Sequence, residues 1–190
     1  IKILQSHFIV MNLLILLFFL VPLFYYRVRG TSWKEIKEKL LPHNTDWKVE
    51  LLGGVKLFGL LLVGFIVIAS VLGATQEVTG IEFNDMQKVD DIVSGEIANN
   101  LGMFVLILII GLFAEEFFFR AFLIRKVGPI ISTAIFTIFH IGYGSIMELI
   151  GVFFLGLILA YWFTKHKSII QNYIGHILYD FLAILLYIII

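Results

Sequence analysis

Two adjacent carboxylates and a guanidinium interrupt an otherwise apolar stretch in the middle of the chain. Glu115 and Glu116 follow an apolar run that begins at Met103, and Arg120 comes four residues later. Ionisable groups inside a membrane span are costly unless they are paired, hydrated or bound, so they commonly mark a functional site. Neighbouring residues point about 100° apart on an α-helix. Glu116 and Arg120 have the i, i+4 spacing of an ion pair, so we assign them mainly supporting roles beside Glu115.

Two later apolar segments also carry polar side chains. His140 is alone near the end of one segment, and Asn172, His176 and Asp180 recur every four residues on another, which places them on one helical face. A lone histidine is more often a hydrogen-bonded packing residue than a catalytic one. A polar stripe can equally hydrogen-bond a neighbouring membrane helix. If these residues lie at the same depth in the membrane, they favour one shared site over separate packing or hydrogen-bonding roles.

The helical rise places these groups in one layer. At about 1.5 Å per residue, Glu115 lies roughly 15 Å from the Arg125 end of its segment, and His140 lies roughly 16 Å from Pro129 at the start of its own. By the same rise, His176 and Asp180 lie roughly 13 and 20 Å from the start of theirs. Four polar groups from three helices at similar depth predict a shared cavity below one membrane surface.

The composition defines the class of protein that must hold this site. The 190 residues are 60% hydrophobic and 15% charged, with a mean hydropathy of +0.99. A soluble domain of this size could not bury so much apolar surface, so the chain is predicted to be a multi-pass membrane protein. Its zero net charge gives no footprint for nucleic acid, and without cysteine it has no thiolate nucleophile or cysteine zinc site. The chain begins at Ile1 rather than methionine, which suggests a truncated N-terminus.

The predicted fold is an all-α membrane bundle of about six transmembrane helices in a single domain, 1–190, with a motif-bearing core of about 98–190. The expected spans are 8–26, 51–74, 98–124, 129–141, 146–164 and 169–190. A capping box at Ser32 and Glu35 opens a short amphipathic helix near residues 32–41, which is expected to lie on the membrane surface. An acidic segment from 75 to 96 is expected to be a solvated loop.

The basic residues predict the orientation of these spans. The connections that follow the first, third and fifth spans carry the lysines and arginines, whereas those after the second and fourth carry one lysine and none. Short cytoplasmic connections hold the excess of positive charge. Six spans with both termini outside therefore satisfy this rule, and they direct the cavity toward the cytoplasm.

Three motif blocks resemble a known family. Glu115-Glu116 with Arg120, then Phe136 with His140, then His176 with Asp180 resemble in order and spacing the CAAX prenyl endopeptidase and bacteriocin-immunity (CPBP, ABI) family of intramembrane proteases. The matching part runs from about residue 98 to the C-terminus. The resemblance implies a helical bundle around a cytoplasm-facing cavity in a cell membrane, with a prokaryotic membrane favoured. The substrate class that it implies is a peptide or protein, with a prenylated C-terminal CAAX peptide as one candidate and membrane lipid as the surroundings.

The resemblance also implies roles for individual residues. Glu115 would activate a water with help from His140, while His176 and the residue at Asp180 would stabilise the oxyanion. Glu116 and Arg120 would order the first of these helices, and Asn172 is added as a supporting residue. No cofactor is required in this mechanism. The family has also been described as metalloproteases, so a divalent metal such as zinc, held by Glu115, His140, His176 or Asp180, remains the alternative.

One position departs from the common pattern. Relatives often carry asparagine where this chain has Asp180, so three carboxylates face one obligate cation in a low-dielectric site. We expect a protonated Asp180, a charged histidine or a bound cation to neutralise them. Our hypothesis is that Asp180 is neutral and donates a hydrogen bond, as an amide would.

Two other classes of function use the same residue types. A membrane scaffold or bacteriocin self-immunity protein could keep the motif without proteolysis, because a fold does not fix a function. A transporter or channel would also place carboxylates and histidines in the membrane. The six segments, however, show no evident inverted repeat, and the polar groups share one depth instead of lining a path. An intramembrane endopeptidase is therefore the favoured interpretation.

Overall fold

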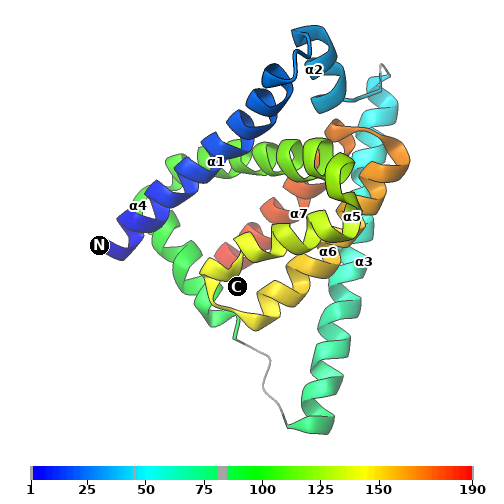
Figure 1. Cartoon of the computed structure of the whole chain (residues 1–190). Coiled ribbons are helices and arrows are strands. Elements are labelled where there is room, and N and C mark those ends of the chain that lie inside the picture. The colour runs from blue at the N-terminus through cyan, green and yellow to red at the C-terminus, as the bar shows by residue number, and fades with distance from the viewer. Residues whose placement is uncertain (1, 45, 81–84, 190) are drawn as a thin grey trace.

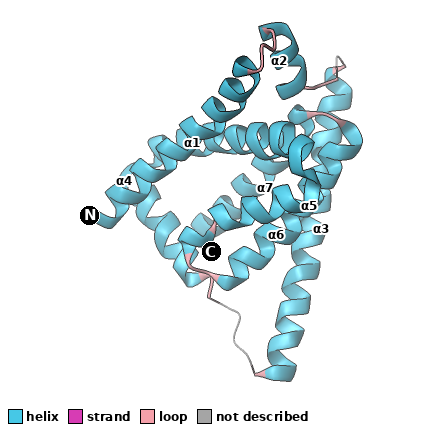
Figure 2. Cartoon of the chain, viewed as in Figure 1, coloured by secondary structure: helices cyan, strands magenta, loops and turns pink. Residues whose placement is uncertain are grey.

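The computed structural model describes residues 2–44, 46–80 and 85–189, with side chains from 12 to 186. This part of the chain is helical, and it contains no strand (Figure 2). The elements are α1 (Lys2–Val28), α2 (Trp33–Leu40), α3 (Trp47–Thr79), α4 (Gln87–Glu115), the π-helix η1 (Glu116–Leu123), α5 (Ile124–Phe139), the 3-10 turn η2 (Ile141–Tyr143), α6 (Ile146–His166) and α7 (Ile169–Ile189). The prediction of an all-α membrane bundle is confirmed.

Four helical stretches of the described chain are long and apolar enough to cross a membrane. They are Trp47–Thr79, Gln87–Tyr143, Ile146–His166 and Ile169–Leu186, and α1 contributes the shorter apolar helix Asn12–Val28. The longest stretch contains both the third and the fourth predicted segments. Figure 1 shows α1 and α4 crossing on one side of the molecule and α3 running along the other, beside α6.

Two departures from helical geometry divide the longest stretch, Gln87–Tyr143, into shorter helices. Asn100 leaves helical geometry at φ −163° and ψ 93°, and its side-chain oxygen accepts a hydrogen bond from the Met103 amide at 3.0 Å. That bond caps the apolar part of α4 within two residues of the predicted start at 98. Gly128 has φ 81° and ψ 170°, a conformation that glycine adopts without a Cβ clash, and Pro129 follows it. The predicted break at this Gly-Pro pair is therefore confirmed.

The prediction of a solvated acidic loop between 75 and 96 is wrong for most of its length. Helix α3 continues to Thr79 and α4 begins at Gln87, while Glu82 lies outside the described residues. Asp85 accepts hydrogen bonds from the Ser145 hydroxyl at 2.7 Å and from the Ile146 amide at 2.9 Å. It thus caps α6, whose first amides have no intrahelical partner. A carboxylate 60 residues away provides this cap, which local periodicity could not reveal.

The short helix α2 has the predicted capping box. The Ser32 side chain accepts from the Glu35 amide, and the Glu35 carboxylate accepts from the Ser32 amide at 2.9 Å. Ile36 and Leu40, on the predicted apolar face, are buried against η1 and α7, whereas Trp33 is exposed. The apolar face of α2 therefore packs on the protein. Its position on a membrane surface stays a prediction.

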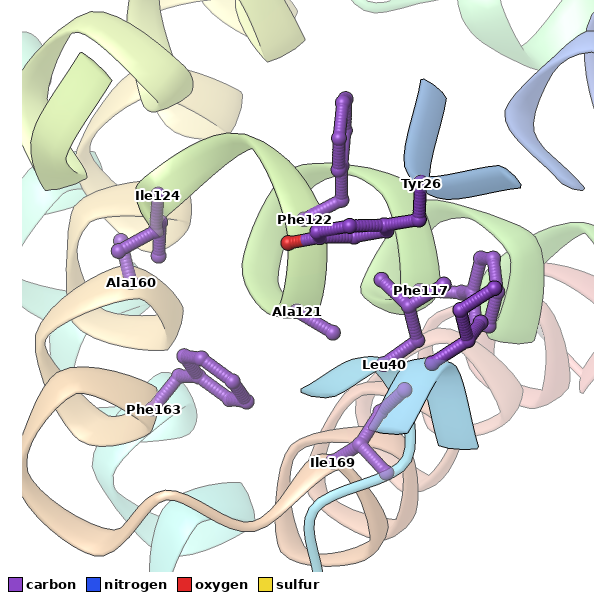
Figure 3. Packing of buried hydrophobic residues seen from close by; sticks show 10 residues of the cluster. Tyr26, Leu40, Phe117, Ala121, Phe122, Ile124, Ala160, Phe163 and Ile169 are labelled. Atoms are coloured by element: carbon purple, nitrogen blue, oxygen red, sulfur yellow. The ribbon is translucent and has the colours of Figure 1, made fainter. Parts of the chain in front are cut away.

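The main core cluster surrounds the motif segment η1. Figure 3 shows Phe122 of this segment beside Tyr26 of α1, and Phe117 and Ala121 on the side of Leu40 of α2. The other buried members come from α2, α5, α6 and α7: Ile36, Ile124, Ala160, Phe163 and Ile169. Elements from the whole length of the chain therefore hold the motif helix in place.

A buried carboxylate joins the start of α3 to the start of α7. The Glu50 side chain is fully buried, and it accepts hydrogen bonds from the Ser168 hydroxyl at 2.5 Å and from the Asn44 amide. Nearby, the Ile169 amide donates to the Pro42 carbonyl at 2.8 Å. These bonds fix the end of α7 from which Asn172, His176 and Asp180 extend.

Candidate active site

The motif helix departs from α-helical geometry where the charged residues begin. Residues Glu116–Leu123 form a π-helix, and the Ile124 amide donates to the carbonyl of Phe119. The buried Ser132 hydroxyl of α5 donates to the same carbonyl at 2.7 Å. Single π-turns inside α-helices are rare and often occur at functional sites. Here the irregular turn is supported from outside by a hydrogen bond from the next helix.

Glu116 is the centre of a buried polar network. Its Oε2 lies 3.5 Å from Arg120 Nε, as the i, i+4 spacing predicted. Its Oε1 lies 2.8 Å from His176 Nδ1 on α7. Glu116 is fully buried, Arg120 is 1% exposed and His176 is 8% exposed. A buried ion pair needs such additional hydrogen bonds to offset its desolvation.

The contact with Glu116 determines how His176 is oriented. A carboxylate only accepts hydrogen bonds, so Nδ1 of His176 carries a proton and Nε2 points away from Glu116. Nε2 lies 3.9 Å from Asp180 Oδ1, beyond hydrogen-bond distance but close enough for electrostatic attraction when the ring is charged. The predicted pair of His176 and Asp180 therefore lies together, next to Glu116.

His140 reaches the same region through Phe136. Its Nδ1 lies 3.0 Å from the Phe136 carbonyl, which only accepts, so Nε2 is left as the accepting nitrogen of a neutral ring. The Phe136 ring lies 4.6 Å from the His140 ring and 6.5 Å from the His176 ring, between centroids. The Arg120 guanidinium carbon lies 4.2 Å from the same Phe136 ring, within cation–π range. One phenylalanine thus contacts three of the predicted site residues.

Glu115 differs from its neighbour in its contacts. No described residue hydrogen-bonds or ion-pairs with its carboxylate, although His176, Asp180, Arg120 and Glu116 all interact with it electrostatically. Glu115 is half-buried, whereas Glu116 is completely enclosed. One glutamate of the pair is therefore committed to structure, and the other is available to a ligand or a water.

The polar stripe on α7 faces two different neighbours. The buried side-chain amide nitrogen of Asn172 donates to the Leu159 carbonyl of α6 at 2.9 Å, while His176 contacts η1. Asn172 therefore joins two helices by a hydrogen bond, the supporting role predicted for it, and His176 is the member that meets the motif helix. The side-chain oxygen of Asn172 has no hydrogen-bond partner among the described residues.

The candidate metal ligands do not gather into a ligand set. Among the described residues, no group of three or more histidine, aspartate or glutamate side chains has the arrangement of a metal site. Nδ1 of His176 and Nδ1 of His140 are both engaged, with Glu116 and with a backbone carbonyl. Nε2 of each ring has no hydrogen bond to a described residue, as in metal-ligating histidines whose other nitrogen is held by a carboxylate or a carbonyl, so the metal alternative stays a prediction and no chemical step is assigned to a metal here.

A groove elsewhere in the bundle is separate from these residues. It has a volume of about 650 Å³ and lies between α3 and α6. Lys165 and His166 lie at one end of it. The rest of its lining is mostly apolar and consists of Leu60, Val63, Gly64, Val67, Ile68, Phe154, Leu157, Ile158, Tyr161 and Trp162. None of the predicted site residues lines it. The predicted cavity around Glu115 stays a prediction.

These features define an all-helical membrane protein that has glutamate, histidine, arginine and aspartate side chains brought together between η1, α5 and α7. Residues 97–182 match the family model of the type II CAAX prenyl endopeptidase Rce1-like proteins. This segment contains all three motif blocks, and the match confirms the predicted resemblance to that family over these residues. At the level of the family, the match supports a CAAX-protease-like intramembrane endopeptidase. No curated protein and no solved structure matches the chain.

Several residues of this region were not predicted to contribute. Phe136 was part of a motif but had no role, and Ser132, which supports η1, was not among the predicted site residues. Their signal in the sequence is their spacing, since Ser132, Phe136 and His140 lie four apart on one face of α5. The contact between Glu116 and His176 had no local signal, because 60 residues separate the partners.

Proposed function

We propose that the chain is an intramembrane endopeptidase in which Glu115 is the general base. The observation that carries this proposal is the difference between the two glutamates. Glu116 is bound by Arg120 and His176, whereas the Glu115 carboxylate has no hydrogen bond to a described residue. A general base must have a free acceptor within reach of a water, so Glu115 meets the requirement and Glu116 does not.

The reaction follows from these roles. Glu115 takes a proton from a water while the water oxygen adds to the scissile carbonyl carbon, which forms a tetrahedral oxyanion. Nε2 of His140 is an acceptor in the neutral ring, so it can orient the second proton of that water. Glu115 then gives its proton to the leaving amine as the C–N bond breaks. The products are one new carboxyl group and one new amine.

His176 and Asp180 are proposed to stabilise the oxyanion. Glu116 occupies Nδ1 of His176, so a proton on Nε2 would be directed to the side where Asp180 lies. Asp180 would donate through a protonated carboxyl group, as an amide would. Donors placed before the charge develops commonly provide the largest part of such catalysis.

The substrate is proposed to be a peptide with a prenylated C-terminal CAAX sequence. The family supports a peptide or protein substrate. We propose that the site opens toward the cytoplasm, as the distribution of basic residues favours, in the prokaryotic membrane that the family resemblance implies. Other peptide precursors, or a non-proteolytic role in bacteriocin self-protection, are the alternatives to this substrate.

Cleavage of a prenylated CAAX-type peptide by the detergent-purified protein tests the proposal. Wild type is compared with Glu115→Gln, which keeps the shape of the side chain and removes its basicity. A matched control is Glu96→Gln, because Glu96 is a buried glutamate of the same helix, α4, that lies outside the motif blocks. Each protein is assayed with and without a chelator.

Each result decides between the candidate functions. Cleavage that survives in Glu96→Gln, disappears in Glu115→Gln and ignores the chelator supports the glutamate mechanism. Inhibition by the chelator would replace it with a metal mechanism. Cleavage retained in Glu115→Gln would show that this residue is not the base. If wild type cleaves no peptide, the prenyl substrate is wrong, and a phenotype retained in Glu115→Gln cells would indicate a scaffold.

A further inference from the structure

A cluster of cations and tyrosines lies on the outside of the motif region. We call Tyr25, Tyr26, Arg29, Lys39 and Lys126 the basic-aromatic cluster. The Arg29 guanidinium carbon is 4.5 Å and Lys126 Nζ is 4.4 Å from the centre of the Tyr25 ring. Lys126 Nζ is also 4.9 Å from the Tyr26 ring, which Lys39 Nζ approaches to 5.7 Å. Positive charges from the end of α1, from α2 and from α5 thus lie beside two adjacent rings.

These charges are not neutralised by the protein. None of the described carboxylates forms an ion pair with Arg29, Lys39 or Lys126. Glu35 interacts electrostatically with Lys39, but its carboxylate is hydrogen-bonded to Ser32 in the capping box. Arg29 and Lys126 share one ring, so they are separated by no more than about a Debye length, roughly 10 Å at 0.1 M salt. Two positive charges this close to each other attract an anion more strongly than either would alone.

The surroundings of the cluster indicate what kind of molecule would carry that anion. Phe24 and Val28, on the last turns of the apolar helix α1, are 71% and 68% exposed, and Trp33 at the start of α2 is 62% exposed. Exposed apolar side chains beside tyrosine, tryptophan and basic residues are typical of the boundary between acyl chains and headgroups. The anion best matched to this surface is therefore a phosphate that carries acyl chains.

The cluster is also connected to the motif helix. Lys126 lies three residues after η1 ends, and its Nζ is 5.7 Å from the ring of Phe122, a buried residue of η1. Phe122 packs edge-on against Tyr25 and Tyr26, with centroids 5.3 and 5.9 Å apart (Figure 3 shows Tyr26 beside Phe122). An anion held by Lys126 and Arg29 would therefore join the end of α1 to the start of α5.

We propose that the basic-aromatic cluster binds the phosphate headgroup of one anionic phospholipid, which bridges α1, α2 and α5 beside the motif helix. This inference does not depend on proteolytic activity, because it rests on charges and rings outside the predicted catalytic residues. Basic pockets between membrane helices are known to bind such headgroups.

Native mass spectrometry of the detergent-solubilised protein, titrated with phosphatidylglycerol or phosphatidylcholine, tests the site. The variant Arg29→Gln/Lys126→Gln removes two charges from the cluster and is expected to weaken phosphatidylglycerol binding roughly 30-fold. The matched control Lys34→Gln/Lys37→Gln removes two exposed charges from α2 and is expected to bind like wild type. Arg29→Lys/Lys126→Arg keeps both charges and should retain binding. Circular dichroism confirms the helical content of each variant, and if the first is unfolded, Lys126→Gln alone should bind roughly fivefold more weakly.

Three results would overturn the inference. Equal loss of binding in the cluster variant and in the α2 control would show diffuse attraction to basic surface. Equal binding of phosphatidylcholine would show that the anionic headgroup is not recognised. Displacement of phosphatidylglycerol by an equal concentration of inorganic phosphate would show that the site takes free phosphate rather than a lipid.

Discussion

The imidazole of His176 on α7 lies 2.8 Å from the carboxylate of Glu116 on η1, and this contact joins the first and third motif blocks of the chain. Arg120 approaches the other oxygen of the same carboxylate. Glu116 therefore holds a cation on its own helix and a histidine on another. Because all three groups are nearly inaccessible to solvent, removing Glu116 leaves a buried guanidinium and a buried imidazole without this partner.

The two neighbouring glutamates should differ in their effect on stability. Replacing Glu116 with alanine leaves the Arg120 guanidinium buried and unpaired, so we expect the free energy of unfolding to fall by about 3–5 kcal/mol. Glu115→Ala removes no described hydrogen bond and should cost much less. Chemical unfolding in detergent, followed by circular dichroism, measures both. Equal destabilisation by the two variants would contradict the assignment of Glu116 as the structural member of the pair.

Ser132 is expected to support the π-helix. Its buried hydroxyl donates to the Phe119 carbonyl, so Ser132→Ala leaves that carbonyl without its second donor and should destabilise the protein by about 1–2 kcal/mol. A matched control is Ser70→Ala, because the Ser70 hydroxyl makes a bond of the same length, 2.7 Å, to Ile66 on an exposed face of α3. Thermal unfolding of both variants measures the difference. A similar loss in both would mean that the bond to η1 has no special role.

Local patterns in the sequence predicted the parts of this structure that depend on local physics. The capping box at Ser32, the break at Gly128 and the ion pair of Glu116 with Arg120 each involve residues within four positions of one another. The apolar runs likewise predicted the membrane helices, because every backbone group in a bilayer must be paired within its own helix.

The features that were missed depend on contacts across the fold. Glu116 with His176 and Asp85 with Ser145 each join residues 60 positions apart, and the buried Glu50 meets Ser168 across 118. Polar residues between 75 and 96 resembled a loop because hydropathy measures preference for lipid, not helicity, and helices α3 and α4 continue beyond the apolar run. The π-helix has no local signature, since part of its support is a hydroxyl on α5.

Asp85 is expected to make the start of α6 sensitive to acid. The hydrogen bond from Ser145, together with those from the Ile146 and Met147 amides and from Lys88, holds the pKa of this carboxyl well below its ordinary value. A lowered pKa in the folded state means that Asp85 contributes its full stabilisation above the ordinary pKa of about 3.9 and loses it as the pH falls through the folded value.

Hydrogen exchange at the Ile146 and Met147 amides measures this effect. Asp85→Asn should speed their exchange at neutral pH relative to wild type, and the difference should shrink as the pH is lowered below about 4. The control Asp90→Asn changes a carboxylate in the first turn of α4 and should leave these amides unaffected. A difference between wild type and Asp85→Asn that stays constant down to pH 2 would contradict the role of the charge.

The contact between α3 and α7 is expected to depend on glycine at particular positions of α3. A Cβ atom placed on Gly54 would lie 2.5 Å from Cβ and 2.4 Å from Cγ2 of Ile174, and 3.3 Å from the Gln171 carbonyl oxygen. Gly54→Ala therefore forces the two helices apart and should destabilise the protein by about 1–3 kcal/mol, with α7 displaced from η1. Gly59→Ala, on the same helix, meets no atom within 4 Å and should not destabilise. Thermal unfolding compares the two, and cleavage assays report whether His176 has moved. If both substitutions are neutral, close packing at Gly54 does not position α7.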